Sequence, residues 1–223
     1  LGEDAAGHQL PYIDRIVMNI ADGRLIPAKT GAGEADLQAR SLSFANYTFL
    51  RQAARRNDFQ VNLWRTAKGA HLALFPNLNV ADPVIRALLR DIRFRRALSL
   101  ATNRREINQV VYFVLAQPGQ HTLLPGSPLY NAAYRNAWAQ FDIAQANRLL
   151  DEMGLTQRDS RGIRLMPDGR PLEMIVESPG EDTEQTDVLE LVTDTWAQAG
   201  IKLYTRPSQL QVFRNRVYAG QSM

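Results

Sequence analysis

The residue types that most often carry catalysis or bind metals are sparse in this sequence and stand far apart. The three histidines, His8, His71 and His121, form neither an HExxH nor an HxH pair, so no two of them have a spacing that favours one shared ion. There is no cysteine, so the chain has no thiolate metal site, no cysteine nucleophile and no disulfide. We therefore expect no metal site and no cofactor, and a structural or surface role for each histidine.

Three other segments contain residues of known enzyme motifs but do not complete those motifs. Ser127 lies in the tetrapeptide PGSP rather than in GxSxG, so it does not form a nucleophile elbow. Gly31 and Gly33 lack the third glycine of a dinucleotide-binding loop and follow an expected helix rather than a strand. Carboxylate pairs such as Asp151-Glu152 are adjacent, without the two distinct environments that acid–base catalysis needs. We predict that the chain is not an enzyme.

A denser group of arginines between residues 86 and 105 allows one alternative function. These arginines surround two expected helices joined by a break, an arrangement that DNA-reading proteins also use. However, the second helix has no cation beyond Arg105, the net charge is only +3, and arginines beside apolar helix positions usually cover the edge of a core. A DNA-binding regulatory domain that uses residues 93–115 therefore stays the alternative function, and we expect no nucleic-acid partner.

Polar residues that follow two expected strands are the candidate ligand-binding residues. Glu177 and Ser178 end a strand that is followed by a helix, and ligands of open α/β sheets bind beyond the carboxyl ends of the strands. Asn77 and Asn79 directly follow another expected strand and offer both donors and acceptors, although asparagines there also make turns. We predict that these four side chains face a ligand.

Three acidic residues come just after this first candidate loop: Glu181, Asp182 and Glu184. They suit the positive end of a helix dipole, which requires no ligand. As part of a site, the same carboxylates would repel an anion and favour an ammonium group or a ligand rich in hydroxyls.

Length and composition set the scale of the fold. The chain has 223 residues, of which 45% are hydrophobic and 22% charged, as expected for one large packed domain or two small ones. The longest apolar stretch, Val110–Ala116, is too short to cross a bilayer, which takes roughly 20 residues. The chain starts at Leu1, and no secretory signal peptide, with its charged segment followed by an apolar one, precedes the first expected strand. We therefore expect a processed piece of a longer protein.

Hydrophobic periodicity predicts an α/β fold, with a mixed sheet flanked by helices. Residues 1–10 are expected to be a tail or linker, and residues 11–223 a single α/β lobe. The last strand, helix and strand form a βαβ unit with parallel strands and a right-handed crossover. The predicted strands are 14–20, 59–65, 71–75, 171–178 and 201–206, and the predicted helices are 24–30, 45–56, 94–101, 103–117, 142–153 and 184–199.

Spacing within these helices predicts buried faces and caps. The helix at 94–101 has an apolar stripe of Phe94, Ala97, Leu98 and Ala101, and the next helix has Ile107, Val110, Val111 and Val114 on one face. Asn103 with Glu106, and Asp142 with Gln145, have the spacing of helix caps.

Several motifs, in this order, resemble those of the extracellular solute-binding proteins of family 5, the dipeptide- and oligopeptide-type receptors of ABC importers. The family usually has Asp where Asn103 stands, and either residue can cap a helix. The match covers nearly the whole chain, and the ordered set is more specific than any one piece. The matching segments are PYIDRI (11–16), GEADL (33–37), FRRALSLATNR (94–104), LLPGSPLY (123–130), FDIAQANRLLDEMGL (141–155) and WAQAGIKL (196–203).

This resemblance implies a type II periplasmic-binding-protein-like fold, in which two lobes close around a ligand. The chain would be most of the second lobe, without the first lobe and without the Trp and Asp with which peptide-binding relatives grip a ligand's amino terminus. In relatives the loop that corresponds to residues 177–183 contacts the ligand. The implied partners are a small solute, with oligopeptide favoured over oligosaccharide, and the membrane subunits of an ABC permease. The implied location is periplasmic or extracellular, with a lipid anchor as one form of attachment.

Overall fold

The computed structural model describes residues 2–64, 68–180 and 183–223. The chain divides into two compact units, Leu1–Trp64 and Arg65–Met223. We expected one lobe over residues 11–223, and the unit boundary falls inside this range. That residues 11–223 work together as one lobe stays a prediction.

The first unit is a pair of helices preceded by extended chain. Its elements are α1 (Ile26–Gly31), the short 3-10 helix η1 (Phe44–Asn46) and α2 (Tyr47–Asn57), so both helices predicted here are confirmed. α1 and α2 approach closely at Gly31, where a Cβ atom would lie 2.7 Å from the ring of Phe49. The Asn57 side chain donates to the Gly31 carbonyl over 2.7 Å and fixes the end of α1 against α2.

The strand predicted at residues 14–20 is wrong. This segment has no regular structure, and its alternating apolar side chains, Ile16, Met18 and Ile20, are 79%, 84% and 98% exposed. The prediction over 59–65 also fails for its described part, because residues 59–64 form no strand. A strand is stable only beside a partner that takes its backbone hydrogen bonds, and these segments find none among the described residues.

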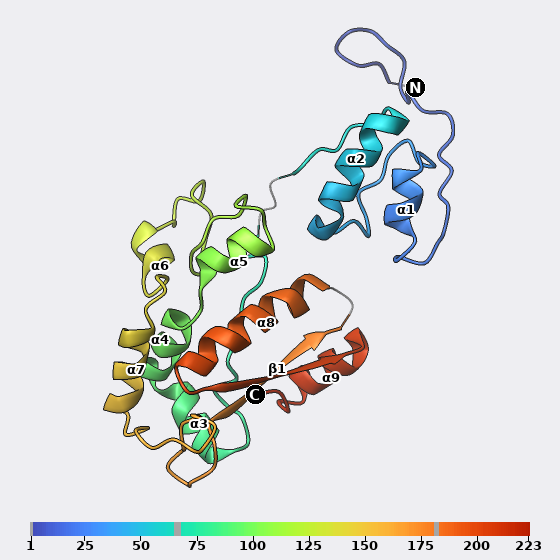
Figure 1. Cartoon of the computed structure of the whole chain (residues 1–223). Helices are drawn as coiled ribbons and strands as arrows, with labels where there is room; N and C mark the ends of the chain where they lie inside the picture. The colour runs from blue at the N-terminus through green and yellow to red at the C-terminus, as the bar shows by residue number, and fades with distance from the viewer. Residues whose placement is uncertain (1, 65–67, 181–182) are drawn as a thin grey trace. The chain divides into compact units, whose positions relative to one another are not determined.

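The second unit contains the predicted βαβ motif (Figure 1). β1 (Glu173–Pro179) and β2 (Lys202–Ser208) are parallel, in a register that pairs Glu173 with Lys202 and Pro179 with Ser208, and α8 (Thr183–Gln198) connects them. In the described residues the sheet consists of these two strands, and antiparallel pairing is limited to isolated bridges. The α/β class is therefore confirmed, with a smaller sheet than the mixed one we expected.

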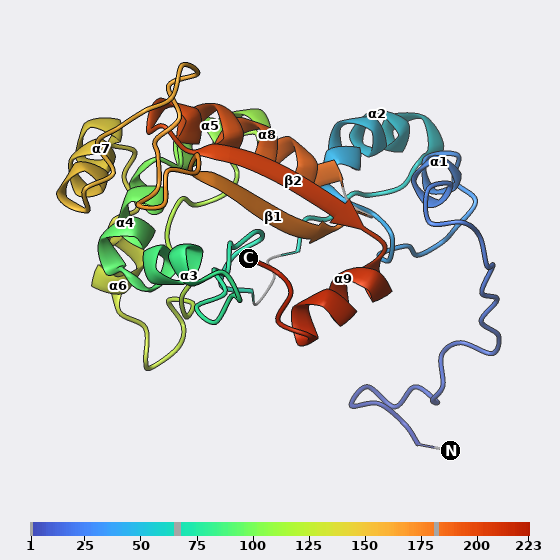
Figure 2. The same cartoon turned by 90° about the horizontal axis from the view of Figure 1, so that it is seen from below.

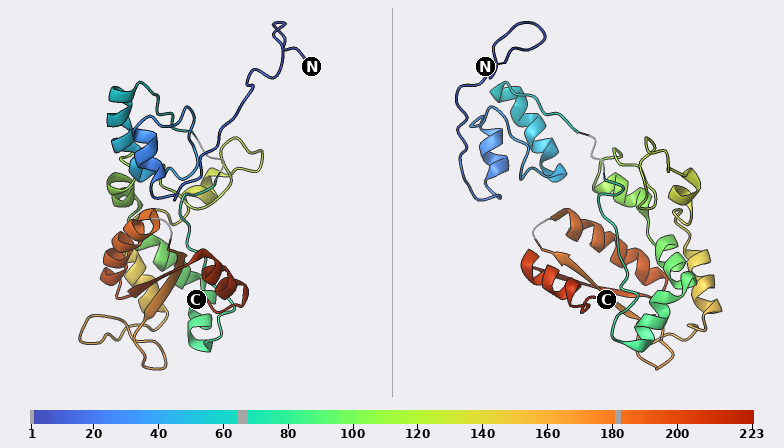
Figure 3. Two further views of the ribbon diagram at one scale, coloured as in Figure 1. Left: turned by 90° about the vertical axis from the view of Figure 1, so that its right-hand side faces the viewer. Right: turned by 180° about the vertical axis from the view of Figure 1, so that it is seen from behind.

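Helices cover both faces of this strand pair. α8 packs on one face, and α9 (Leu210–Tyr218), which we did not predict, lies on the opposite face (Figures 2 and 3). The remaining helices form a layer beside the sheet, in which α4 packs against α7. These helices are α3 (Pro83–Arg90), α4 (Ile92–Leu100), α5 (Arg104–Val110), α6 (Ala132–Asn136) and α7 (Ile143–Glu152).

The core of the second unit is one cluster of buried side chains, which contains the apolar stripe of α4 together with residues of α7, α8 and β2. Phe94, Ala97 and Ala101 have no exposed surface, as the spacing of the stripe predicted, and Leu98, the fourth residue of the stripe, is partly buried. Trp196 of α8 is also buried, and its indole N–H donates to the hydroxyl of Thr102 over 3.1 Å. This bond ties α8 to the turn between α4 and α5.

Two predicted helix caps are confirmed. Asn103 accepts from the backbone N–H of Glu106 over 3.2 Å at the start of α5, and its own amide donates to the Glu106 carboxylate over 3.0 Å. Asp142 accepts from the N–H of Gln145 over 2.8 Å at the start of α7. These side chains satisfy N–H groups that have no partner within the helix.

The helix predicted to continue from Asn103 almost to Pro118 ends at Val110 instead. There the side chain of Asn108 bonds to the backbone of Ala116. Its amide N–H donates to the Ala116 carbonyl, and its amide oxygen accepts from the Ala116 N–H, both over 2.9 Å. Val114, expected on the buried face, is 67% exposed. Within the described residues, no helix combines the length and apolar character needed to span a membrane.

Candidate functional site

The candidate site lies at the carboxyl end of β1, where Glu177 is held by two arginines. The Glu177 side chain is only 4% exposed. Arg216 of α9 donates to both its carboxylate oxygens, over 2.7 and 2.8 Å, in a bidentate pair. Arg206, the register partner of Glu177 on β2, adds a third bond of 3.3 Å.

This arrangement fixes the charge state of Glu177. The hydrogen bonds from Arg216 are the largest cause of a lowered pKa for the carboxyl group, and they outweigh the effect of burial. The two arginines together carry one more charge than the carboxylate. Glu177 therefore acts in this structure as an anchor for α9 and β2, with its carboxylate directed into the ion pairs rather than towards solvent.

The structure connects Asn77 to Glu177 through the last residues of the chain. The Asn77 amide donates to the Ser222 carbonyl over 2.7 Å and to the Gly220 carbonyl over 3.4 Å. The Ser222 hydroxyl in turn donates to the Glu177 carboxylate over 3.4 Å. Two predicted site residues, 100 positions apart in sequence, are thus brought to one place.

Asn79 belongs to the same loop but has a different contact. Its N–H donates to the Asn77 side-chain oxygen over 2.9 Å, which makes a local turn, and its own side chain accepts from Arg90 of α3 over 2.7 Å. The strand predicted at 71–75, which we expected to lead into this loop, is wrong, since residues 71–77 have no regular structure. The loop is held by α3 and the chain end instead of by a sheet.

Ser178 is half-buried on β1, beside the loop after the strand. Glu181 and Asp182, two of the three acidic residues noted in that loop, lie outside the described residues. The third, Glu184, accepts a 2.5 Å hydrogen bond from the hydroxyl of Tyr112, whose ring lies 5.6 Å from that of His71. An acidic residue of the first turn of α8 is thus bonded to the segment after α5.

Several of the arginines between residues 86 and 105, which suggested the alternative of DNA binding, make bonds within the fold. Arg93 pairs with Asp91 at 2.7 Å, and Arg95 donates to the Leu89 and Arg90 carbonyls. Arg104 donates to Ser99, and burial lowers the pKa of its guanidinium. These side chains stabilise helix ends and turns.

Arg164 is a buried charged residue that we did not identify from the sequence. The Arg164 side chain is 2% exposed and bonds to the Asp151 carboxylate at 2.6 Å, the Asn147 side chain at 2.7 Å and the Ala199 carbonyl at 2.9 Å. Its partners come from α7 and from the end of α8, so its role is to join these elements. Local sequence carries no signal for it, because its partners, which include the Leu155 carbonyl, lie 9 to 35 positions away.

A metal site needs several ligands in one place. Among residues 2–64, 68–180 and 183–223, no three side chains of His, Asp or Glu are grouped closely enough to hold an ion. The polar groups of the candidate site are an ion-paired carboxylate, amides and hydroxyls, which can bind a solute by hydrogen bonds.

Comparison with protein families identifies one that covers almost the whole chain. The model of "Bacterial extracellular solute-binding proteins, family 5 Middle" matches residues 6–222. A "Probable ABC transporter-binding protein" of Deinococcus radiodurans is 27% identical over 209 residues, which are 90% of this chain and 34% of that protein. The oligopeptide-binding protein OppA of Lactococcus lactis is 24% identical over 63% of this chain and 23% of its own length.

Solved structures agree with this family. A structure of an oligopeptide-binding protein OppA is 34% identical and matches with a TM-score of 0.69, over 91% of this chain and 32% of that one. A periplasmic oligopeptide-binding protein of Thermotoga maritima, 18% identical, shares the fold with a TM-score of 0.64 over 92% of this chain and 38% of that one. The chain spans about a third of the length of these proteins.

Proposed function

Because the chain belongs to the bacterial extracellular solute-binding proteins of family 5, we propose that it is part of the substrate-binding component of an ABC importer. This component captures a peptide or a similar small solute between two lobes and delivers it to the membrane permease. The observation that carries the proposal is the family match over residues 6–222, which is almost the whole chain.

The proposed mechanism is capture without chemistry. A solute that touches both lobes binds the closed form more tightly than the open form, and this difference in affinity shifts the population towards closure. The permease then recognises the closed form. The chain needs only donors and acceptors with fixed positions for this role, and the bonds among Glu177, Arg216 and Asn77 fix such positions.

We propose that Asn77, Asn79, Glu177 and Ser178 form this chain's part of the solute-binding surface. The position of Glu177 and Ser178 at the carboxyl end of a parallel strand supports this, as does the link from Asn77 to Glu177 through Ser222. Since the Glu177 carboxylate is already paired, its part is to hold the neighbouring backbone and Arg216 in place. Asn79 and Ser178 are then the side chains with polar atoms to offer a solute.

An oligopeptide is the favoured solute, because the Lactococcus lactis relative and the solved structure at 34% identity carry the name oligopeptide-binding protein. An oligosaccharide is the second class. We place the protein in the periplasm or outside the cell, held in its longer form by a lipid anchor or free, and the permease subunits are its protein partners.

Isothermal titration tests this proposal. We expect the isolated chain to bind a peptide mixture weakly or not at all, because it lacks the contacts of a second lobe, and the longer two-lobe protein to bind it tightly. In that protein, Ser178→Ala should weaken binding at least tenfold, and Ser160→Ala, in an exposed turn of the same unit, should not. Micromolar binding of a peptide by the isolated chain would contradict the two-lobe mechanism.

A further inference from the structure

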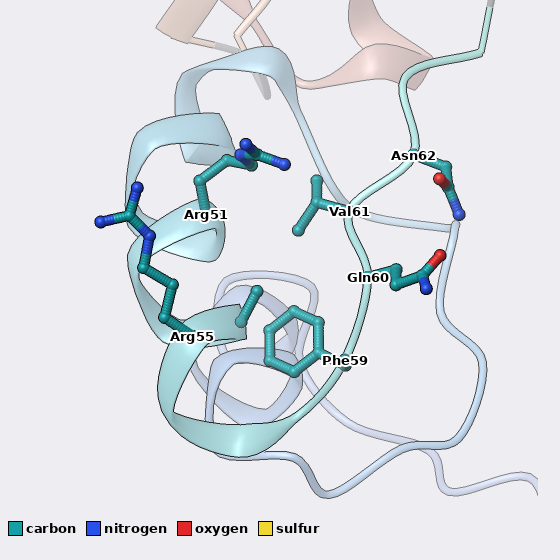
Figure 4. Close-up of a pocket in the computed structure, with 7 residues that line it drawn as sticks. Arg51, Arg55, Phe59, Gln60, Val61 and Asn62 are labelled. Carbon is teal, nitrogen blue, oxygen red and sulfur yellow. The ribbon is translucent and has the colours of Figure 1, made fainter.

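A pocket of about 310 Å³ lies entirely within the first unit. It is formed between α2 and the extended segment that follows it, and its lining includes Arg51, Arg55, Phe59 and Val61 (Figure 4). No residue predicted to bind a ligand takes part in it. The function proposed above leaves this pocket unexplained.

The two arginines give the pocket its charge. They are four positions apart on α2, so they lie on the same face of the helix, one turn apart. Both are exposed, and neither has a carboxylate within ion-pair distance in the part of the chain that the structure describes. Two like charges at this spacing repel each other, so an anion placed between them would be stabilised by both.

The other side of the pocket is apolar. Phe59 and Val61 alternate along the extended segment and point towards α2, whereas Gln60 and Asn62 point the other way (Figure 4). Ala54 completes the lining from the helix. The Arg51 guanidinium is directed towards the extended segment, whereas that of Arg55 is directed away from it (Figure 4). The pocket therefore has one guanidinium beside hydrocarbon, which suits a ligand with an anionic group next to an apolar one.

We propose that the pocket between α2 and residues 59–62 binds a carboxylate that carries an apolar group. The carboxylate is held by Arg51, the charge of Arg55 one turn along α2 adds to the attraction, and the apolar group packs on Phe59, Val61 and Ala54. A planar carboxylate matches the fork of donors on a guanidinium, and a fully hydrated ion such as phosphate gains nothing from the apolar side. The proposal rests on the first unit alone and does not depend on the import function.

The test uses the whole chain and three probes: N-acetyl-leucine, its uncharged amide N-acetyl-leucinamide, and inorganic phosphate. Binding is followed by amide chemical shifts in nuclear magnetic resonance, which also give the location. We expect N-acetyl-leucine to bind at least tenfold more tightly than either other probe, with shifts at Ala54, Phe59 and Val61. Equal binding of the amide or of phosphate, or shifts only at other residues, would overturn the proposal.

Variants test the two arginines separately from the net charge. Arg51→Gln/Arg55→Gln should weaken N-acetyl-leucine binding at least tenfold. The control Arg148→Gln/Arg214→Gln removes the same charge from exposed positions on α7 and α9, and it should change binding less than twofold. An unchanged affinity in the first variant, or an equal loss in the control, would contradict the assignment. The shift map of the unmodified chain keeps the test decisive if the first variant does not fold.

Discussion

The ion pair between Glu177 and Arg216 should stabilise the folded chain, and Glu177→Gln measures by how much. Glu177→Gln keeps the size of the side chain and one acceptor oxygen but removes the charge that Arg216 and Arg206 bind. A hydrogen bond to a charged group contributes about 1.5–3 kcal/mol. The Arg216 and Arg206 side chains are 30% and 50% exposed, so water replaces part of what is lost. We expect the free energy of unfolding to fall by about 2 kcal/mol at neutral pH.

The effect should depend on pH in one direction. The pKa of Glu177 is lowered in the folded chain by the hydrogen bonds from Arg216, whereas in the unfolded chain it has the ordinary value of about 4.3. The stabilisation is therefore present above the unfolded pKa and is lost as the pH falls through the lower, folded pKa. The difference between the unmodified chain and Glu177→Gln should stay constant from pH 7 down to about pH 4.3 and should shrink as the pH falls further.

Urea unfolding followed by circular dichroism measures both effects. Glu190→Gln is the matched control, because Glu190 is exposed on α8 and forms no ion pair in the described chain, and it should change stability by less than about 0.5 kcal/mol. A double-mutant cycle with Arg216→Gln isolates the pair. Two results would refute the anchoring role of Glu177. One is that Glu177→Gln loses no more stability at neutral pH than the control does. The other is that its loss of stability is as large at low pH as at neutral pH.

Three further predictions concern the elements that position the site. Phe94→Ala should lower the free energy of unfolding by about 3–5 kcal/mol in urea unfolding, because the ring has no exposed surface; a loss below about 1 kcal/mol would mean that α4 is not part of the core. Asn103→Ala should cost about 1 kcal/mol and Asn103→Asp almost nothing, since only alanine removes the cap of α5; equal losses in thermal melts would contradict this. Gly200→Ala should cost more than about 1 kcal/mol, because φ is +78° and a Cβ would lie 2.6 Å from Arg158 and 2.8 Å from Arg164; an unchanged melting temperature would show that this turn relaxes freely.

Local signals in the sequence predicted the elements that build the second unit. The apolar stripe through Phe94 and Ala97 and the capping pairs at Asn103 and Asp142 depend on residues within two turns of each other, and all of them are confirmed. The βαβ unit followed from two alternating strands and one amphipathic helix. Each of these features is set by neighbours in the sequence, so one sequence was enough.

Features that depend on distant partners could not be predicted in this way. The alternation at residues 14–20 and 71–75 is typical of strands, but a strand forms only where another strand is available. The early end of α5 depends on the side chain of Asn108 reaching the backbone of Ala116. The burial of Arg164 depends on partners in two helices that follow no fixed spacing.

The same limit applies to the candidate site. The position of Glu177 at a strand end was predictable, but its pairing with Arg216 depends on α9, which we did not predict. The link from Asn77 to Ser222 spans 145 positions and has no sequence signal.

We propose above all that this chain belongs to a protein that holds a solute and does not transform it. Mass spectrometry of the two-lobe protein, purified from its own cells and then denatured gently, tests this directly. We expect the release of an intact small solute, most simply a set of short peptides, in an amount close to one molecule per protein. Release of no solute, or conversion of an added solute to a product by the purified protein, would contradict this binding role.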